Sequence, residues 1–456
     1  MHLVIEYIKN RLKTIAILPP DAACRAMNGT PITPRMIALD LLAAVLKHHR
    51  PLDEALAQSQ DLAIQDVRDR AFVRNLTATT LRRLGQIDDA IGRCLERPLP
   101  RRAIGVRDVL RLGACQLLFL NTPAHAAVDT AVTTAANRGL GDYKKLINAV
   151  LRRLSKEGQR FLADQDAGRL NTPQWLWESW TAAYGIETCR RIAEAHLFEP
   201  PLDITVKADP EKWAGLLNAE ILATGSLRLT AGGSVTAMPG FDEGAWWVQD
   251  AAAALPVKLL GDIRGRHVID IGAAPGGKTA QLLNAGAQVT AVERSEKRTT
   301  RLLGNLARLG LRAETVVADA GAWSPEAPAD AVLLDAPCSS SGTIRRHPDV
   351  ARLKTPEDIG KLASAQERLL DAAIGMVAPG GMIIYCTCSL QPEEGPERIG
   401  KLIGSGAPVV REPLSASDVG GLKELLSAEG DLRSLPCHMG GQGGMDGFYA
   451  SRLIRQ

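Results

Sequence analysis

The feature that most constrains the fold is a series of five short apolar segments in residues 241–456, separated by helical stretches and polar turns. The segments are HVIDIG, QVTAVE, ETVVAD, AVLLDAP and GMIIYCTC, and the helical patterns include KTAQLLNAG, KRTTRLLGNLARLG and SAQERLLDAAIGMV. This alternation predicts a parallel sheet covered by helices, an α/β fold. Ligands of such sheets bind at the carboxyl ends of the strands, so we expect functional residues at that edge.

The rest of the chain has a different pattern, and 456 residues are too many for one ordinary domain. Apolar positions recur at helical spacing after residue 33, as in MIALDLLAAVLK, which predicts an all-helical domain. Alternation at Leu202, Ile204 and Val206, followed by the helical PEKWAGLLNAEIL, predicts a small α+β module. The expected parts are an N-terminal extension at 1–33, the helical domain at 34–158, a helical connector with the α+β module at 159–240, and the α/β domain at 241–456.

Charge is unevenly distributed along the chain. The whole sequence has a formal net charge of +3, yet residues 31–155 hold nineteen Lys and Arg against twelve Asp and Glu, a local charge of +7. A basic part joined to a near-neutral part suits a protein that holds a polyanion with one and performs chemistry with the other. A solvated helical surface would have the same composition, so charge alone leaves both interpretations open.

Terminal sequence and cysteine spacing argue against other classes. The opening MHLVIEYIKNRLKTIAILPP has an apolar run too short for a signal-peptide core, and no run reaches the length of a membrane span. The eight cysteines lack the paired spacings of a zinc site or a disulfide framework. We therefore expect free thiols, no metal site, no membrane association and a cytoplasmic location.

The stretch VIDIGAAPGGKTAQL, residues 268–282, contains a glycine loop with more than one interpretation. Its GAAPGGKT matches the phosphate-binding loop of NTPases, and AVLLDAP offers Asp335 as a magnesium ligand. Asp270 opens the loop, however, and a carboxylate there would repel a triphosphate. A dinucleotide site fits less well, because Ala274 occupies the position of the second glycine in G-x-G-x-x-G.

Two acidic residues at strand ends favour a nucleoside without phosphates. Glu293 ends the second apolar segment, about twenty residues after the loop, where an acid accepts hydrogen bonds from ribose hydroxyls. Asp319 follows the third segment, where a side chain can meet an adenine edge. S-adenosylmethionine has these groups, and its positive charge tolerates carboxylates. The combined residues predict S-adenosylmethionine as the cofactor and S-adenosylhomocysteine as its product, although strand-end capping would explain either acid singly.

Two cysteines follow apolar segments in similar turns. LLDAPCSSSG places Cys338 shortly after Asp335, and IIYCTCSLQPEE places Cys388 after the fifth segment. A thiolate that adds to C6 of a pyrimidine makes C5 able to attack a sulfonium methyl. A hydrogen bond at N3 stabilises the adduct, which is a suitable role for Asp335. One thiol can attack the base while the other assists release.

These motifs resemble those of a known family. DIGAAPGGKT, DAPCSSSGTIRRHPD, YCTCSLQPEE and DGFYASRL are similar to the RNA cytosine-C5 methyltransferases of the Nol/Nop/Sun family, and the helical part, with INAVLRRL, resembles NusB-like RNA-binding domains. The resemblance implies a Rossmann-like class I methyltransferase domain preceded by an RRM-like α+β module. The combination is similar to bacterial members that act on 16S ribosomal RNA. This resemblance implies that the protein is a monomer whose partner is 16S ribosomal RNA, either free or in an assembly intermediate. The implied target is cytosine 967.

The resemblance also implies residue roles. Cys388 of the TCS turn would be the nucleophile, Cys338 would assist product release, and Asp335 would contact the base and the cofactor. The cofactor would be bound by Gly272, Ala273, Ala274, Pro275, Gly276, Gly277, Lys278, Glu293, Asp319 and Asp335. The candidates for RNA contacts are Arg345, Arg346, Arg152 and Arg153.

The chain departs from the family pattern at three positions. Gly272 stands where a cysteine is common, Glu293 stands where Asp is usual, and Cys386 adds a third thiol, which we interpret as a small buried hydrophobe. Trp246 and Trp247 could stack on a base, and packing is an equal alternative. His347 in RRHPD could touch phosphate, although a structural loop role is the better interpretation.

Two other functions remain open from the sequence. DNA cytosine methyltransferases use a Pro-Cys after the fourth strand as the nucleophile, and Pro337-Cys338 has that arrangement. A non-catalytic RNA-binding assembly factor would need only the basic helical part. The presence of the acids, the loop and both thiols together argues against such a relic.

Overall fold

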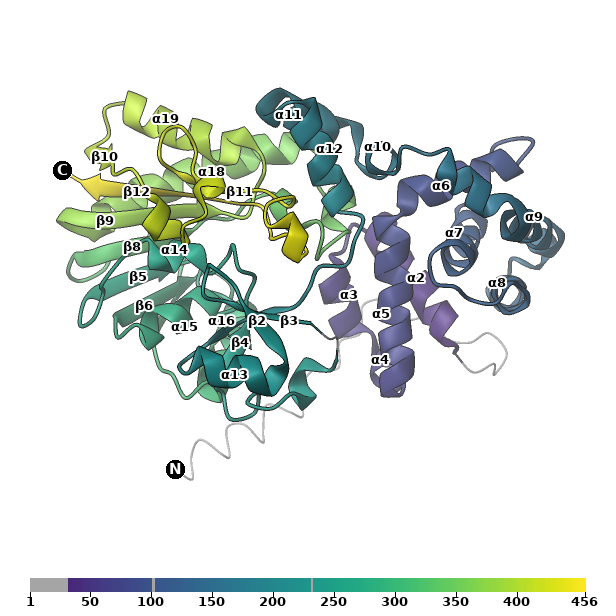
Figure 1. Cartoon of the computed structure of the whole chain (residues 1–456), viewed down its shortest axis with the longest axis horizontal. Coiled ribbons are helices and arrows are strands. Elements are labelled where there is room, and N and C mark those ends of the chain that lie inside the picture. The colour runs from purple at the N-terminus through teal and green to yellow at the C-terminus, as the bar shows by residue number, and fades with distance from the viewer. Residues whose placement is uncertain (1–31, 101–102, 231–232) are drawn as a thin grey trace.

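The computed structural model describes residues 32–100, 103–230 and 233–456, so the predicted N-terminal extension at 1–33 falls almost wholly outside the described residues. Figure 1 shows a bundle of helices on one side of the molecule and a twisted sheet covered by helices on the other, with a small second sheet below and three connecting helices above. The all-helical N-terminal domain and the α/β domain predicted from the sequence are both confirmed.

Within the described residues, the N-terminal domain is a bundle of eight α-helices. They are α2 (Pro34–Leu46), α3 (Leu52–Gln58), α4 (Gln60–Ala63), α5 (Val67–Arg82), α6 (Leu84–Cys94), α7 (Ile104–Leu118), α8 (Ala124–Asn137) and α9 (Lys144–Ala163). Helix α7 forms the centre, with Val106, Leu110 and Ala114 fully buried. Helix starts follow local chemistry: the hydroxyl of Thr33 accepts a hydrogen bond from the Met36 amide at the start of α2. Helix α9 continues past the predicted boundary at 158.

Three helices connect the bundle to the rest: α10 (Ala167–Asn171), α11 (Gln174–Tyr184) and α12 (Ile186–Ala195). They pack on the α/β domain. Trp180 of α11 is fully buried, and its indole Nε1 donates to Gln391 Oε1 at 2.8 Å. Tyr184 at the end of α11 donates its hydroxyl to the carbonyl of Leu390. The connector therefore supports the segment that immediately follows Cys388.

The small module contains the four-stranded sheet. Its elements are β1 (Asp203–Val206), α13 (Pro210–Leu217), β2 (Ala219–Ile221), β3 (Leu227–Leu229) and β4 (Trp246–Val248). The strand order is β2-β3-β1-β4, and every pairing is antiparallel. Because β4 pairs with β1, the module extends to Val248 and the expected boundary at 240 is too early. Trp246 and Trp247 are 0% and 5% exposed, so they pack in the interior and have no free face for a base.

The large sheet has the predicted strands at its centre. Its strands are β5 (His267–Ile271), β6 (Gln288–Glu293), β7 (Glu314–Val317), β8 (Ala329–Asp335), β9 (Val377–Thr387), β10 (Val409–Arg411), β11 (Leu432–Ser434) and β12 (Phe448–Arg455). The order is β10-β12-β9-β8-β5-β6-β7, with β11 paired to β12. Strands β5 to β9 are parallel, whereas β10, β11 and β12 are antiparallel additions, so the sheet is mixed.

Helices cover both faces of this sheet. They are α14 (Leu255–Lys258), α15 (Gly277–Asn284), α16 (Glu296–Arg308), α18 (Pro356–Met376) and α19 (Pro396–Gly404), whereas α17 (Val350–Leu353) lies against α2 of the helical domain. Successive strand residues enter different cores: Leu333 and Ile384 pack on one face, and Leu334 and Tyr385 pack on the other. Burial on both faces explains why these strands are nearly continuous apolar runs in the sequence.

Candidate active site

The sheet topology brings the polar strand ends together. Strand β8 lies between β5 and β9, and Asp335 at the end of β8 is paired in register with Cys386 of β9. The glycine loop leaves the end of β5, and the two cysteine turns leave the ends of β8 and β9. Three segments separated by many residues in the chain therefore meet at one edge, which is the carboxyl edge expected for ligand binding.

The glycine loop has to pass very close to the neighbouring strand. Gly272 has φ 79°, and a Cβ atom there would lie 2.4 Å from the carbonyl oxygen of Asp335. Gly276 has φ 105° and a Cβ would meet Leu302 at 2.7 Å. Larger residues would strain both positions. The loop residues Ala273, Ala274 and Pro275 lie between these glycines, and α15 begins directly after them at Gly277.

A buried carboxyl group lies under the loop. Asp270 is 0% exposed and accepts a hydrogen bond from the Thr279 hydroxyl at 2.6 Å, while its Oδ1 has no partner among the described residues. Burial raises the pKa of Asp270 to about 7, against the weaker opposing effect of the Thr279 bond. The loop is therefore anchored by a carboxyl group that is partly protonated at neutral pH.

The two acids predicted to bind the nucleoside lie at successive strand ends. Glu293 is 4% exposed, and its Oε1 accepts from the amide of Ser295 at 3.0 Å. Arg298 approaches Oε2 at 3.2 Å outside hydrogen-bond geometry, so this buried oxygen has no hydrogen-bond partner in the described residues. A buried carboxylate oxygen that accepts no hydrogen bond from the protein can accept one from a ribose hydroxyl. Asp319 is more exposed and accepts from Gly321 and Arg368, and the Arg368 bond lowers its pKa.

The Asp335 carboxylate has two side-chain neighbours, a charged ammonium group and a buried thiol. Lys278 Nζ donates to its Oδ2 at 2.8 Å, and Cys386 Sγ lies 3.7 Å from its Oδ1. Burial would lower the pKa of Lys278, but the attraction of Asp335 prevails and raises it. The ammonium group also lies 4.9 Å from the ring centroid of Phe448 on β12. Lys278 therefore remains charged and orients Asp335.

The third thiol is a buried one. Cys386 is 0% exposed, and burial with the nearby charge of Asp335 raises its pKa well above the ordinary value for a thiol. Residues two apart on a strand point to the same side, so Cys386 is expected on the side of Cys388. In the structure the Cys386 side chain points toward Asp335. The full burial of Cys386 agrees with its interpretation from the sequence as a small buried hydrophobe.

The two predicted catalytic cysteines face each other. The Sγ atoms of Cys338 and Cys388 are 3.4 Å apart, and both side chains are partly accessible. Their contact gives the thiols different character: the hydrogen bond from Cys338 lowers the pKa of Cys388, and the same interaction together with burial raises the pKa of Cys338. These opposite directions favour Cys388 over Cys338 as the thiolate of the pair, although either sulfur could donate in their contact.

A polar cluster beneath the cysteine turns was not predicted from the sequence. Glu394 is fully buried, and its carboxylate accepts from the Ser339 amide at 2.9 Å and from the Ser389 hydroxyl at 2.6 Å. Gln366 of α18 donates to the same carboxylate and to the carbonyl of Pro337. The signal was present in the serine that directly follows each cysteine and in the QPEE sequence.

The expectation that Arg345 and Arg346 bind RNA does not fit the structure. Arg345 is 2% exposed, and its guanidinium donates to Asp446 at 2.7 Å and to Asp250 at 3.0 Å. Arg346 donates to the same two carboxylates, and the attraction of Asp446 and Asp250 outweighs burial to raise its pKa. These arginines stabilise the loop after Cys338 from inside the protein.

The other candidates for RNA contact are on the surface. Arg152 and Arg153 are exposed on α9, where Arg153 pairs with Glu157 at 3.1 Å. His347 is half exposed and lies 3.3 Å from Asp53 of the helical domain, which favours a structural role at the domain boundary. RNA binding by Arg152 and Arg153 stays a prediction.

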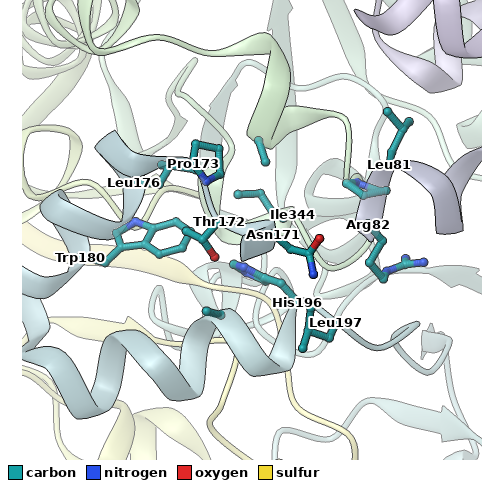
Figure 2. A pocket seen from close by; sticks show the side chains of 13 residues that line it. Leu81, Arg82, Asn171, Thr172, Pro173, Leu176, Trp180, His196, Leu197 and Ile344 are labelled. Atoms are coloured by element: carbon teal, nitrogen blue, oxygen red, sulfur yellow. The ribbon is translucent and has the colours of Figure 1, made fainter. Parts of the chain in front are cut away.

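The helical domain, the connector and the catalytic loop enclose a small cavity of about 20 Å³. Figure 2 shows Arg82 of α5, Trp180 and His196 of the connector region, and Ile344 after the Cys338 turn around it. Burial, with Arg345 and Arg82 nearby, lowers the pKa of His196 to about 3, so its ring is neutral. Such a volume holds about one water molecule and no nucleoside. The cavity thus marks a domain junction.

No helix in 32–100, 103–230 or 233–456 has both the length and the apolar character of a membrane span. The same part of the chain has no group of three or more His, Cys, Asp or Glu residues arranged to hold a metal ion.

Comparisons with known proteins agree with this geometry. A sequence profile described as 16S rRNA methyltransferase RsmB/F matches residues 257–454, and the NusB family profile matches residues 32–156. The ribosomal RNA small subunit methyltransferase B of Erwinia tasmaniensis is 33% identical over 439 residues, 92% of this chain and 98% of that protein. The protein of the same description from Pseudomonas putida is 35% identical over 443 residues, 93% of this chain and 99% of that protein.

A solved structure has a similar fold over about two thirds of the chain. The methyltransferase homolog protein from Pyrococcus horikoshii is 27% identical, with a TM-score of 0.53 over 64% of this chain and 98% of that one. Its match adds structural similarity to the sequence similarity of the relatives. Because identity with those relatives extends along nearly the whole chain, the protein belongs to the RsmB/F family of rRNA methyltransferases and is an S-adenosylmethionine-dependent RNA methyltransferase with an N-terminal NusB-family domain.

Proposed function

We propose that the protein methylates C5 of a cytosine in 16S ribosomal RNA through a covalent bond between Cys388 and C6 of the base. The observation that carries the proposal is the 3.4 Å contact between the Sγ atoms of Cys338 and Cys388, next to Asp335. The position implied by the family resemblance is cytosine 967. The proposal places a monomer in the cytoplasm, acting on free 16S RNA or on an assembly intermediate.

The residues present fit S-adenosylmethionine as the methyl donor. The buried Oε2 of Glu293 accepts no hydrogen bond from the described residues, although the Arg298 guanidinium lies 3.2 Å away, and it suits a ribose hydroxyl. The loop from Gly272 to Lys278 passes beside the Asp335 carbonyl and leads into α15 at the carboxyl edge of the sheet. Asp319 is accessible at the next strand end. When bound, S-adenosylmethionine supplies an electrophilic methyl group on its sulfonium.

The chain's own groups then account for the reaction at the base. The Cys388 thiolate adds to C6, and Asp335, carrying a proton taken up from solvent, donates it to N3 and so stabilises the negative charge that develops on the ring. C5 becomes enamine-like and acquires the methyl group. The C5 proton then passes to solvent as the bond between C6 and Sγ breaks, which returns Cys388 as a thiolate, and N3 gives its proton back to Asp335. The thiol of Cys338, directly beside Cys388, is placed to assist this release.

The cytosine has to be accessible for this addition. C6 must reach Cys388 while C5 faces the methyl donor, so the base has to leave its stack or lie in an unpaired loop. The partly accessible thiols at the open edge of the sheet are consistent with the approach of a base from solvent.

Replacing each cysteine singly tests the assignment of roles. Cys388→Ala should abolish methylation, and Cys338→Ala should accumulate a covalent protein–RNA adduct that survives denaturing electrophoresis. Cys94→Ala, a half-buried thiol of the helical domain, is the matched control. An adduct that forms with Cys388→Ala and not with Cys338→Ala would instead favour the arrangement of DNA cytosine methyltransferases.

The target position requires a separate measurement. Bisulfite mapping of 16S RNA from cells with and without the gene should show one protected cytosine that disappears on deletion. A protected base in another RNA would contradict the proposed substrate without affecting the cysteine chemistry.

A further inference from the structure

Glu394 links the two cysteine turns from below. Its carboxylate accepts a hydrogen bond from the amide of Ser339, the residue after Cys338, at 2.9 Å, and another from the hydroxyl of Ser389, the residue after Cys388, at 2.6 Å. Its carbonyl oxygen accepts from the hydroxyls of Tyr385 and Thr387 on β9. One buried side chain therefore holds both turns in register.

The charge of this carboxylate is not neutralised by a cation. Glu394 is 0% exposed and forms no salt bridge with any residue that the structure describes. All its partners are neutral: a backbone amide, a serine hydroxyl and the amide of Gln366. Hydrogen bonds can stabilise a buried carboxylate but leave its electrostatic effect on nearby groups.

The two thiols experience different charges. Glu394 is among the groups that disfavour ionisation of Cys338, after the bond to Cys388 and burial. Around Cys388, the hydrogen bond from Cys338 lowers its pKa, burial and the charge of Asp335 oppose this, and the hydroxyl of Ser340 and the ammonium of Lys278 favour the thiolate. The negative charge beside Cys388 is thus paired with an ammonium, since Lys278 donates to Asp335 at 2.8 Å, whereas the charge of Glu394 beneath Cys338 has no paired cation among the described residues.

We propose that Glu394 is a positioning residue that selects which of the two facing cysteines is the nucleophile. It holds the turns so that the Sγ atoms meet, and its negative charge keeps Cys338 as the thiol that donates to Cys388. This inference rests on the proposed function, because it explains why Cys388 acts as the nucleophile.

The test measures thiol ionisation in the full-length protein without RNA. Peptide-resolved alkylation by iodoacetamide, followed across pH, gives the midpoint for each cysteine. Cys388→Ser isolates Cys338, and Cys338→Ser isolates Cys388, which avoids the shared titration of a coupled pair. In the first background, Glu394→Gln should lower the midpoint of Cys338 by about one pH unit, the usual scale for removal of a nearby like charge.

The matched control is Glu397→Gln, which removes the same charge from an exposed position on α19. It should leave both midpoints unchanged. In the Cys338→Ser background, Glu394→Gln should move the midpoint of Cys388 much less than it moves Cys338. An unchanged Cys338 midpoint, or equal shifts of both thiols, would overturn the proposal.

Turnover provides a second readout. In the otherwise wild-type protein, Glu394→Gln should lower kcat at least about tenfold, with little change in KM for RNA, because positioning acts on the chemical step. A rise in KM alone would contradict this role.

If Glu394→Gln does not fold, two other measurements test the role of Glu394. Glu394→Asp retains the charge, so Cys338 should still react at higher pH than Cys388, and inversion of that order would count against the proposal. In the wild-type protein, Cys388 should be alkylated at lower pH than Cys338. Failure of the proposed function would appear separately, as an adduct formed without Cys388 while the alkylation order is retained.

Discussion

At the scale of single residues, the carboxyl groups of the site differ in what surrounds them. Asp335 is paired with Lys278, Glu293 accepts from an amide, and Asp270 is buried with only the Thr279 hydroxyl as a partner. The same chemical group therefore has several environments in one small region: in the proposed function Asp335 contacts the base and Glu293 binds the nucleoside, while Asp270 anchors the loop. Environment decides between these roles.

The raised pKa of Asp270 predicts a pH-dependent stability. The pKa rises from the ordinary 3.8 to about 7 in the folded protein, so between these values the unfolded chain ionises while the folded protein stays protonated. The free energy of unfolding should therefore fall as pH rises from about 4 to about 7, by on the order of 4 kcal/mol in total. Asp270→Asn cannot ionise and should lose this dependence.

Thermal unfolding of both proteins across pH 4 to 8 checks this. The variant should gain stability relative to wild type as pH rises, and the difference should level off above the folded pKa. Asp371→Asn, an exposed carboxyl group on α18, serves as the control. Parallel curves for wild type and Asp270→Asn would show that Asp270 is ionised throughout.

At the scale of elements, the loop between β5 and α15 works because one strand end lies directly against another. Gly272 has no Cβ, so the loop can approach the backbone of β8 at Asp335. The position of the cofactor loop and the position of the catalytic carboxylate are thus coupled. A change in one must move the other, since a packed core does not deform continuously.

Gly272→Ala should disturb both the loop between β5 and α15 and the position of Asp335. The new Cβ would lie 2.4 Å from the Asp335 carbonyl at a φ of 79°, which should reduce the free energy of unfolding by about 2 kcal/mol or more. Calorimetric titration should show weaker S-adenosylmethionine binding. Gly304→Ala in α16, where a Cβ meets nothing within 4 Å, should bind normally and be at least as stable as wild type. Equal behaviour of the two variants would refute the coupling.

At the scale of the whole molecule, the NusB-family domain contacts the catalytic loop directly. Arg82 of α5 donates to the carbonyl of Arg345 at 2.9 Å, and the amide of Leu52 at the start of α3 donates to Asp349 at 2.9 Å. Arg352 of α17 donates to the carbonyl of Asn171 in the connector at 3.0 Å. The segment after Cys338 is therefore held by the helical parts as well as by its own domain (Figure 1).

Asp349→Ala should weaken this junction. The variant leaves the buried Leu52 amide without its acceptor, which costs about 1–3 kcal/mol. Limited proteolysis should then cut between the helical domain and the connector at lower protease concentration. Asp129→Ala, which removes an exposed carboxylate from α8 inside the helical domain, should change the cleavage little. Identical cleavage of both variants would mean that Asp349 does not hold the domains together.

Salt dependence tests RNA binding by α9. Arg152→Gln combined with Arg153→Gln should weaken RNA binding across sequences and reduce the slope of log K against log salt concentration by about 0.7–0.9 for each phosphate that the protein no longer neutralises. Arg264→Gln removes an exposed charge just before β5, at the opposite edge of the sheet from the cysteines, and should leave the slope unchanged. Unaltered slopes for the double variant would move the RNA interface elsewhere.

Much of the fold and site was predictable because the signals are local. The five central strands, the helical N-terminal domain, the glycine loop and the cysteine turns all follow from short patterns that neighbouring residues determine. The last strand of the small module was not predictable in this way. Strand β4 has only three residues, and its partner β1 lies about forty residues earlier, at Thr205 opposite Trp247.

By itself, the sequence determined the order of elements, the carboxyl-edge location of the site and the identity of the two thiols, since periodicity and strand–turn chemistry act over a few residues. Only the tertiary structure decided what each charged group does. Arg345 belongs to a motif that suggests phosphate binding, yet its partner Asp446 lies 101 residues further along the chain and takes it into the interior. Glu394 binds both cysteine turns from beneath because β8 and β9 are neighbours, and burial and electrostatic environment depend on such distant contacts.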